Sequence, residues 1–505
     1  LVALIVGMVL SLAALTAATS PLEVFVAWEL MTLTSFFLVV RGRFAAAASV
    51  RYLTFSLASA LLMLAAFSLA TAANPAFGTG GGVIGTLTTS VPWAAVLLAL
   101  SVLIKLGAIG LHIWLPSSYA EAEDEVSSLA SSVLSKAGIL LLFLGAGSFA
   151  APLFAGVALN QVLGWIGVIT ALAGGMMALF QEDIKYTLAY SSMSQLGYMV
   201  LAFALMSHLG WVTALYLAVN HLLFKGMLFL AVAGIVMRTG TRLMYQMGGL
   251  IKRMPFSFVS VLVGIIAVSG VPPLAGFGGK WLLYTALIEQ GWYLQAALAL
   301  FSSGIAFLYL FRLIHSMFLG QRKTHHDTVT EAPAAVLIPQ FVFLVIIIAI
   351  SMFPNLLIKP LQTIVEPAFA SSVRWEGYTV ISSLGYWNGN AVMYVVIGVF
   401  LAPLLWLLAV KGRTYRVEQF NIVFAAERPH TPQSTHYAYN FYGHYQKAFG
   451  RLLDPWVERF WSGVSATAGT VSQTLRAWNT GNPQTYALQI LLYLFLTYLV
   501  ARGGL

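Results

Sequence analysis

The chain contains no cysteine and few charged residues, and both absences narrow its class. Without cysteine, its 505 residues cannot form disulfides, thiolate-held iron–sulfur clusters or cysteine zinc sites. Only 9% of the residues are charged, far below the roughly 25% of soluble domains, whereas 59% are hydrophobic. Alternation with period two over ten-residue blocks is also lacking, which disfavours a membrane β-barrel. The composition therefore predicts an all-α polytopic membrane protein.

Apolar runs of 18 or more residues recur along the chain and predict about thirteen transmembrane helices. The predicted spans lie near residues 1–20, 22–40, 52–73, 92–114, 127–149, 160–180, 186–207, 211–236, 256–287, 292–319, 334–353, 388–410 and 484–501. The chain opens at Leu1 in an apolar run, with neither a basic leader nor a small-residue cleavage site. We therefore expect its natural N-terminus to be missing.

The basic residues predict the topology. If the loop with Arg41, Arg43 and Arg51 is cytoplasmic, alternating sides place almost all other loop lysines and arginines inside as well. This distribution predicts a multi-pass protein of a bacterial-type inner membrane, with the C-terminus on the outer side. The net charge of +9 then reflects the basic residues of the cytoplasmic loops and does not indicate an anionic partner.

A polar interruption over residues 411–483 precedes the last span, on the predicted cytoplasmic side. Large apolar residues recur at helical spacing from about Tyr437 to Trp478, with basic residues among them and a possible break at Pro455. This pattern favours an amphipathic lateral helix along the membrane surface or a partner. The alternative is an ordinary surface helix of a small cytoplasmic cap.

Four lysines lie deep inside predicted spans: Lys105, Lys136, Lys225 and Lys280. A lysine at mid-membrane costs roughly 2.5–3.5 kcal/mol even on the translocon-insertion scale. Snorkelling to the headgroups requires a position near a helix end, and these lysines are too central for it. A titratable amine in a dry interior suits the movement of protons or cations, so the set predicts a transport function.

Helix-breaking residues accompany two of these lysines. Pro272 and Pro273 stand with several glycines shortly before Lys280, and Gly107 and Gly110 follow the first buried lysine. Such residues interrupt a helix and free backbone carbonyls at membrane depth, which is a feature of ion sites in transporters. We expect a broken helix at each position.

Other titratable residues extend this candidate pathway. Glu29 is the one deep acid, and a nearby carboxylate favours the protonated form of a lysine. His221 lies one turn before Lys225 and is a candidate relay, whereas His112 suits a relay or a packing role almost equally. An acidic cluster is either a solvated turn or a proton entrance at a cytoplasmic loop. Its members are Glu121, Glu123, Asp124 and Glu125.

Six stretches in order resemble the motifs of the antiporter-like membrane subunits. The stretches are VAWELM, LIKLGAIGLHIWLP, VLSKAG, EDIKYTLAYSSMSQLGYM, NHLLFKGMLFL and SGVPPLAGFGGKW. This family occurs in respiratory complex I, in group 4 membrane-bound hydrogenases including formate hydrogenlyase types, and in multisubunit cation/proton antiporters. The resemblance covers about residues 1–320, and the lateral-helix arrangement resembles the distal complex I subunit.

The resemblance implies a role for each buried residue. Glu29 matches the family's essential glutamate on its fifth helix, and Lys105 the lysine of its broken seventh helix. Lys136 matches the eighth-helix lysine or histidine. His221 and Lys225 match the pair on the eleventh helix, and Lys280 the lysine of the broken twelfth. Two inverted five-helix repeats would each form a half-channel, and about three helices would precede residue 1.

Some positions depart from the family pattern. A proline-bearing turn before the eighth helix is replaced by AEDEVSSL, and Leu217 stands where some relatives have a further histidine. The distal complex I subunit usually has histidine in place of Lys136. These departures favour a hydrogenase-type or otherwise divergent complex over ordinary complex I.

The resemblance predicts a redox-inactive subunit of a redox-driven complex that translocates protons, with Na⁺ as the alternative ion. No cofactor is expected in this chain; flavin, iron–sulfur or NiFe centres would lie in a peripheral redox arm, and further membrane subunits would be its partners. Open alternatives are a component of a secondary cation/proton antiporter, a membrane partner of an inorganic-carbon uptake complex, and a structural anchor. The expected organisation is an N-terminal remainder (1–20), a translocation core (21–320), added helices (321–410), the lateral-helix segment (411–483) and an anchor (484–505).

Overall fold

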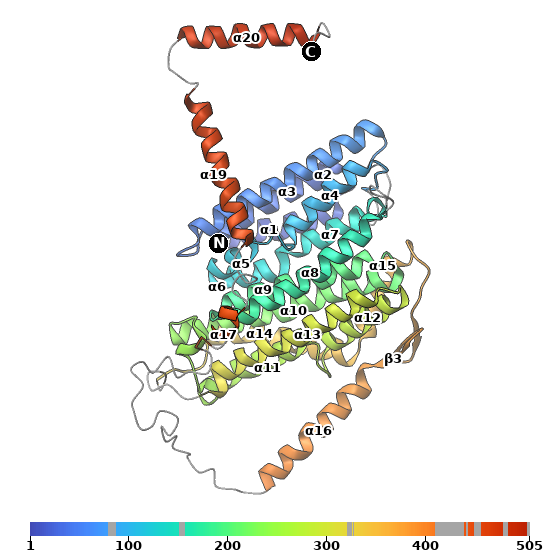
Figure 1. The fold of residues 1–505 in the computed structure, drawn as a ribbon. Coiled ribbons are helices and arrows are strands. Elements are labelled where there is room, and N and C mark those ends of the chain that lie inside the picture. The colour runs from blue at the N-terminus through green and yellow to red at the C-terminus, as the bar shows by residue number, and fades with distance from the viewer. Residues whose placement is uncertain are drawn as a thin grey trace. The chain divides into compact units, whose positions relative to one another are not determined.

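A computed structural model describes most of the chain and resolves it into two units, Leu1–Gly443 and His444–Leu505 (Figure 1). The described residues are 1–78, 87–150, 157–320, 326, 328–409, 439–440, 443–448, 456–477 and 483–501. The first unit is a bundle of helices, with one small sheet among its described residues.

The bundle begins with three long helices and a broken one, as expected for runs of apolar residues. Its first part comprises α1 (Val2–Ala17), α2 (Pro21–Val39), α3 (Ala46–Ala73), α4 (Pro92–Lys105), α5 (Trp114–Glu121), α6 (Asp124–Leu129), a π-helical turn (Ala130–Leu134) and α7 (Lys136–Leu144). Its second part comprises α8 (Leu159–Phe180), α9 (Ile184–Ala204), α10 (His208–Thr239), α11 (Pro255–Ser269), α12 (Ala275–Glu289), α13 (Tyr293–Ile314) with a π-helical turn (His315–Leu319), α14 (Ala334–Met352), α15 (Asn355–Val365) and α16 (Gly389–Ala409).

The helices follow the predicted apolar runs, and three runs are subdivided. Seven helical segments of the described residues are long and apolar enough to span a membrane, and four shorter apolar helices accompany them. The run 92–114 contains the whole of α4 and the non-helical stretch before α5, and the run 256–287 contains most of α11 and of α12. The run 127–149 contains α7 and the π-helical turn before it.

Close contact between α8 and α9 forms the centre of the bundle. Glycines at the crossing bring the two backbones together: a Cβ on Gly167 would lie 2.7 Å from the Leu201 nitrogen, and one on Gly197 would lie 2.4 Å from the Ala171 nitrogen. Small residues permit this approach between membrane helices, which then associate through close packing. The core around α9 is almost fully buried.

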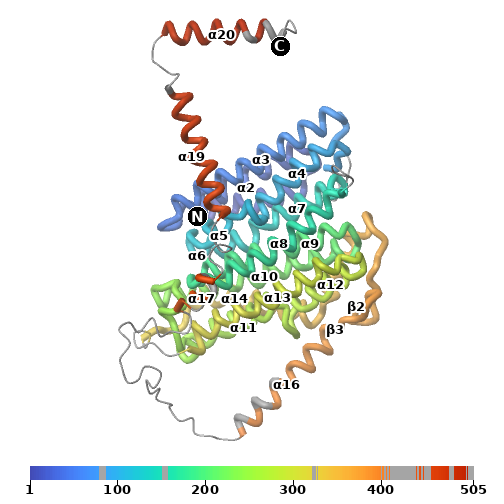
Figure 2. The backbone as a smooth tube through the Cα atoms, in the orientation of Figure 1, coloured from blue at the N-terminus to red at the C-terminus, as the bar shows by residue number. Residues whose placement is uncertain are grey.

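The two ends of the bundle differ in composition. Ion pairs gather at the end that holds Arg41, Lys185 and Arg242, called here the basic end. Near the far end of α12 lies a three-stranded antiparallel sheet of β1 (Arg374–Glu376), β2 (Thr379–Ser382) and β3 (Gly385–Asn388), called here the sheet end (Figure 2). No pattern in the sequence predicted this sheet.

The second unit contains α19 (Trp456–Ala477) and α20 (Pro483–Ala501), and the short helix α17 (Gly443–Ala448) lies at the boundary. α19 covers the second half of the predicted amphipathic stretch, and the rings of Phe460 and Trp461 lie 5.3 Å apart on it. α20 covers the last predicted span. Residues 411–438 and the predicted break at Pro455 lie outside the described residues.

The α8–α9 crossing yields a stability prediction. A Gly197→Val substitution places side-chain atoms against the α8 backbone, which cannot yield as a flexible side chain can. We expect a loss of at least about 1–3 kcal/mol, the usual range for overpacking, and a lower melting temperature of the purified protein. Gly304→Val is the matched control, because a Cβ on Gly304 meets no atom within 4 Å. Equal melting temperatures for the two variants would contradict the close crossing.

Candidate functional site

The first helix break follows Lys105 directly. α4 ends at this lysine, and Gly107 and Gly110 adopt positive φ angles of 62° and 87° before α5 begins. A Cβ on Gly107 would lie 2.6 Å from the Leu115 side chain, so glycine is needed there for conformation and for space. The Trp114 indole N–H donates to the Ile104 carbonyl oxygen at 2.8 Å and so satisfies a group at the end of α4.

Lys105 lies in an aromatic pocket and is only 1% exposed. Its Nζ donates to the Tyr52 hydroxyl at 3.3 Å and lies 5.3 Å from the Trp28 ring centroid and 5.2 Å from the Tyr52 ring centroid. Faces of aromatic rings attract a cation, most strongly where water is excluded. Glu29 follows Trp28 on α2 and is partly exposed, and the ion pairs of the described residues do not include it.

Lys136 and His221 are in direct contact. The Lys136 Nζ and the His221 Nδ1 form a short hydrogen bond between α7 and α10. The same Nζ donates to the Ser131 carbonyl oxygen and to the Ser135 hydroxyl, both at 3.1 Å. The π-helical turn Ala130–Leu134 immediately precedes this lysine, and such turns are frequent at functional sites. The His221 Nε2 is buried and has no hydrogen-bond partner among the described residues.

Lys225 continues this cluster one turn along α10. Its side chain is fully buried, and its Nζ donates to the Leu188 carbonyl oxygen of α9 at 2.8 Å. The Ser192 hydroxyl also donates to that oxygen, at 3.0 Å, and lies 2.9 Å from the Ser131 hydroxyl. A chain of hydrogen bonds thus joins Lys225 to the π-helical turn beside Lys136.

Lys280 is bound at the second break. α11 ends at Ser269, and Gly270 follows with φ of 71°. The Lys280 Nζ donates to the Ser269 carbonyl oxygen at 2.6 Å and to the Ser303 hydroxyl at 2.5 Å, and lies 5.5 Å from the Tyr198 ring centroid. A cation beside the last carbonyls of a helix also interacts favourably with the helix dipole. Pro272 and Pro273 lie in the connection between α11 and α12.

His112 lies apart from the other candidates. It is in the non-helical stretch between α4 and α5, is 3% exposed, and its Nδ1 has no hydrogen-bond partner among the described residues. This placement is compatible with a relay role and with a packing role, the two roles that the sequence also left open for His112.

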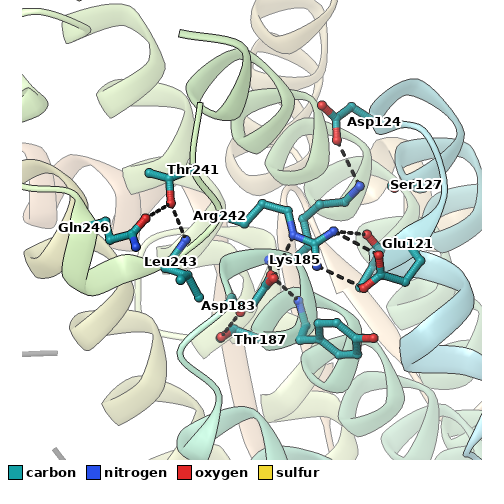
Figure 3. A network of polar contacts seen from close by, with 12 residues as sticks. Glu121, Asp124, Ser127, Asp183, Lys185, Thr187, Thr241, Arg242, Leu243 and Gln246 are labelled. Atoms are coloured by element: carbon teal, nitrogen blue, oxygen red, sulfur yellow. Dashed lines mark hydrogen bonds and ion pairs between the residues drawn. The ribbon is translucent and has the colours of Figure 1, made fainter. Parts of the chain in front are cut away.

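The acidic cluster is largely ion-paired. Arg242 bridges Glu121 and Asp183, with nitrogen–oxygen distances of 3.0 and 2.7 Å (Figure 3). The Lys185 Nζ lies 2.9 Å from Asp124, and the other acid–base contact joins Arg41 and Glu123 at 3.0 Å. Glu125 is exposed and belongs to none of the ion pairs in the described part of the chain.

The ion pairs of Arg242 with Glu121 and Asp183 are called here the clamp. They join the end of α5, the start of α9 and the segment after α10 at the basic end. Asp183 also caps α9, because its Oδ1 accepts hydrogen bonds from the Lys185 and Tyr186 backbone nitrogens at 2.7 and 3.2 Å. Burial raises the pKa of Glu121, but hydrogen bonding and the charge of Arg242 outweigh it and leave that pKa below its usual value. The same carboxylates raise the pKa of Arg242 against the effect of burial. Glu121 and Arg242 therefore both favour their charged forms.

Sequence reasoning identified the ionisable residues but missed the hydroxyls that join them. Tyr52, Ser131, Ser192 and Ser303 contact the buried amines directly or through one neighbour. Clusters of serine within apolar helices, for example in YSSMSQ, are the sequence feature that could have predicted these hydroxyls. No group of three or more His, Cys, Asp or Glu residues that could hold a metal occurs in the described part of the chain.

Known proteins share this arrangement of helices. Residues 18–306, more than half of the chain, match the family described as NADH:quinone oxidoreductase/Mrp antiporter, TM, and the chain belongs to this family. It is therefore a multi-pass membrane protein of the antiporter-like type that the sequence motifs predicted.

Individual relatives come from several kinds of complex. The chain is 30% identical over 430 residues to a Na⁺/H⁺ antiporter subunit of Alkalihalophilus pseudofirmus, a match that covers 77% of the chain and 52% of that protein. It is 29% identical to hydrogenase-4 component B of Escherichia coli, over 65% of the chain and 52% of the relative. The chain thus spans about half the length of these curated relatives.

A solved structure matches almost the whole chain. It is that of the membrane-bound sulfane sulfur reductase, an archaeal respiratory membrane complex, with a TM-score of 0.85 and 26% identity. The match covers 97% of this chain and 83% of the chain in that complex. The likeness therefore extends beyond the family-matched region 18–306.

The clamp yields a prediction on stability and its pH dependence. Arg242→Ala leaves two partly buried carboxylates unpaired, so we expect a loss of roughly 1–3 kcal/mol of unfolding free energy. Because the pKa of Glu121 is lowered in the folded protein, the clamp's contribution is present at neutral pH and is lost as the pH falls through that value.

Thermal unfolding of the purified protein at neutral and acidic pH measures both effects. Arg253→Ala is the matched control, an exposed arginine of the same loop that takes part in none of the ion pairs of the described residues. A difference between Arg242→Ala and the native chain that stays constant into the acidic range would contradict the role of Glu121.

Proposed function

We propose that this chain is the proton-translocating membrane subunit of a redox-driven respiratory complex. The direct contact between Lys136 and His221, with Lys225 buried one turn further along α10, is the observation that carries the proposal. Buried bases within hydrogen-bond reach of one another can pass a proton without crossing apolar space. A packing role alone would not favour three such groups in one dry region.

The coupling follows from charge repulsion. Two cations in direct contact in a medium of low dielectric constant repel each other strongly, so Lys136 and His221 favour sharing one excess proton. A proton that arrives on one group favours release from the other. Glu29 and Lys105 form the end of this axis nearest the N-terminus, where a change in the carboxylate's charge would shift the proton affinity of the amine.

The finer architecture also belongs to this proposal. Each broken helix has a buried lysine next to the break, Lys105 after α4 and Lys280 in α12, which supports two inverted five-helix repeats with one half-channel each. About thirteen helices would span the membrane, with the basic end in the cytoplasm. α19 would belong to a lateral helix on that side. Glu125 and the ion-paired acids would form the entrance, with His112 as a further relay.

The partners would be further membrane subunits and a peripheral redox arm, which would hold any redox centre. Likeness to a chain of a respiratory membrane complex supports this over an isolated transporter. The expected setting is a bacterial-type inner membrane. Mass spectrometry of the native complex tests the class: co-purification of redox subunits supports the proposal, and co-purification of small antiporter subunits alone opposes it.

The pathway itself is tested by two substitutions. Lys105→Ala removes the amine from its aromatic pocket, and Glu29→Gln removes the acid's charge. We expect either change to abolish proton pumping in proteoliposomes of the assembled complex while assembly stays intact. Lys252→Ala, at an exposed loop, is the matched control and should pump normally. Unchanged proton transfer in both Lys105→Ala and Glu29→Gln would refute the mechanism.

A second candidate is a component of a secondary Na⁺/H⁺ antiporter, which the 30% identity to such a protein favours. It predicts uptake of radioactive sodium into proteoliposomes driven by a pH gradient alone. For the redox-driven proposal we expect no such flux, because conduction requires a driving partner. Sodium uptake that is lost in Lys225→Ala would establish the second candidate instead. A role in inorganic-carbon uptake would appear as carbon accumulation in cells.

A further inference from the structure

The sheet at the end of the bundle presents one apolar face to the helices. Trp375, Val380 and Trp387 are paired across the three strands and therefore share one face. Val380 is fully buried and Trp387 is 3% exposed, whereas Tyr386, the neighbour of Trp387 on the other face, is 74% exposed. This inner face contacts α10, α12 and α15.

Trp387 fits against the first turn of α12. A Cβ on Gly278 would lie 2.1 Å from the indole ring, so any residue larger than glycine at this position would collide with the ring. The indole also faces the rings of Tyr216 on α10 and Trp281 on α12, at centroid distances of 6.4 and 6.5 Å. Trp387 thus lies between α10 and α12. Its neighbour Gly278 is only two residues before Lys280 in the sequence.

Several contacts fix the sheet to the helices. The Trp375 indole N–H donates to the Gln362 side-chain oxygen on α15 at 2.6 Å. The Ser383 hydroxyl forms a short hydrogen bond with Glu289 at the end of α12. Just after β3, the backbone of Gly389 lies so close to α14 that a Cβ would be 2.4 Å from the Ser351 carbonyl oxygen. The sheet is therefore held by three helices.

We propose that this sheet is a fixed seal over the space between α10 and α12, with the Trp387 indole at its centre, that prevents water and protons from passing through this space between the sheet-end solution and Lys280. The inference rests on the proposed proton translocation. A broken helix exposes carbonyls that attract water. The buried Tyr216 hydroxyl, which has no hydrogen-bond partner among the described residues, would also bind water if the indole were absent. A site open to solution there would dissipate the gradient.

The passive proton conductance of the assembled complex in liposomes tests the seal. A potassium diffusion potential drives protons, and an internal pH dye reports their entry without turnover. We expect Trp387→Ala to raise this conductance several-fold and Trp387→Phe to raise it less. Tyr386→Ala is the matched control on the same strand and should not change it. Conductance of Trp387→Ala and Trp387→Phe equal to that of the control overturns the proposal.

The route of the leak is tested in a second background. If protons pass by Lys280, combining Trp387→Ala with Lys280→Ala lowers the conductance to that of Lys280→Ala alone. A leak that persists in the double variant reflects general loosening and overturns the proposal. Gly278→Ala should also leak, because the added methyl group displaces the indole. Adding Trp387→Leu to Gly278→Ala should reduce that leak.

Because the chain has no cysteine, a cross-link between two introduced cysteines can test whether the seal is fixed. Glu289→Cys with Ser383→Cys, bridged by a reducible bis-methanethiosulfonate reagent, joins the sheet to α12 at a contact between exposed residues. We expect pumping to continue in the cross-linked form. Pumping lost on cross-linking and regained on reduction would show a moving gate and overturn the fixed seal. Passive conductance is measured without turnover, whereas the Lys105→Ala and Glu29→Gln tests measure pumping. The seal proposal can therefore be overturned while the proposed function stands, and the proposed function can be overturned while the seal proposal stands.

Discussion

The fold depends on how a positive charge is kept in a dry helical bundle. Burying an unpaired amine is costly, and the structure offsets this cost with backbone carbonyls released by irregular helix geometry. Lys280 binds the last carbonyl of α11 at a break, and Lys136 binds a carbonyl of a π-helical turn. Lys225 binds a carbonyl of α9 that Ser192 also uses. Lys105 differs, because two aromatic rings and a phenol hydroxyl surround it instead. At Lys136 and Lys280, irregular helix geometry thus provides the carbonyl oxygen that binds the buried amine.

This constraint explains why small residues matter at the centre. Glycines at the α8–α9 crossing let the backbones approach, and α9 then supplies hydroxyls and carbonyls to helices on both sides. A proton passing between Lys136 and His221 would need only small movements, since these two groups already form a hydrogen bond. The clamp of Arg242 holds the start of α9 and the end of α5 together at the basic end, so the spacing of the row is fixed from one end of the bundle.

The two ends of the bundle serve different purposes in this scheme. Charged residues at the basic end pair with one another and remain close to solvent, whereas aromatic rings pack where the sheet meets α10 and α12. A pathway that pumps ions must not be open to both solutions at the same time, because simultaneous access would let the two solutions equilibrate.

The sequence by itself determined the membrane class, the helical runs and the ionisable residues inside them, because apolar runs and costly charges are local features of a chain. It also indicated where α4 and α11 end, since glycine and proline act on the backbone at their own positions. Tertiary structure alone decided which groups meet. The contact of Lys136 with His221 joins residues 85 positions apart, and the bridge from Arg242 to Glu121 joins residues 121 apart. The place of Trp387 against Gly278 likewise depends on a short sheet that no apolar run marks. Such pairings follow from how helices pack, and packing depends on the shape of the whole bundle rather than on any one segment.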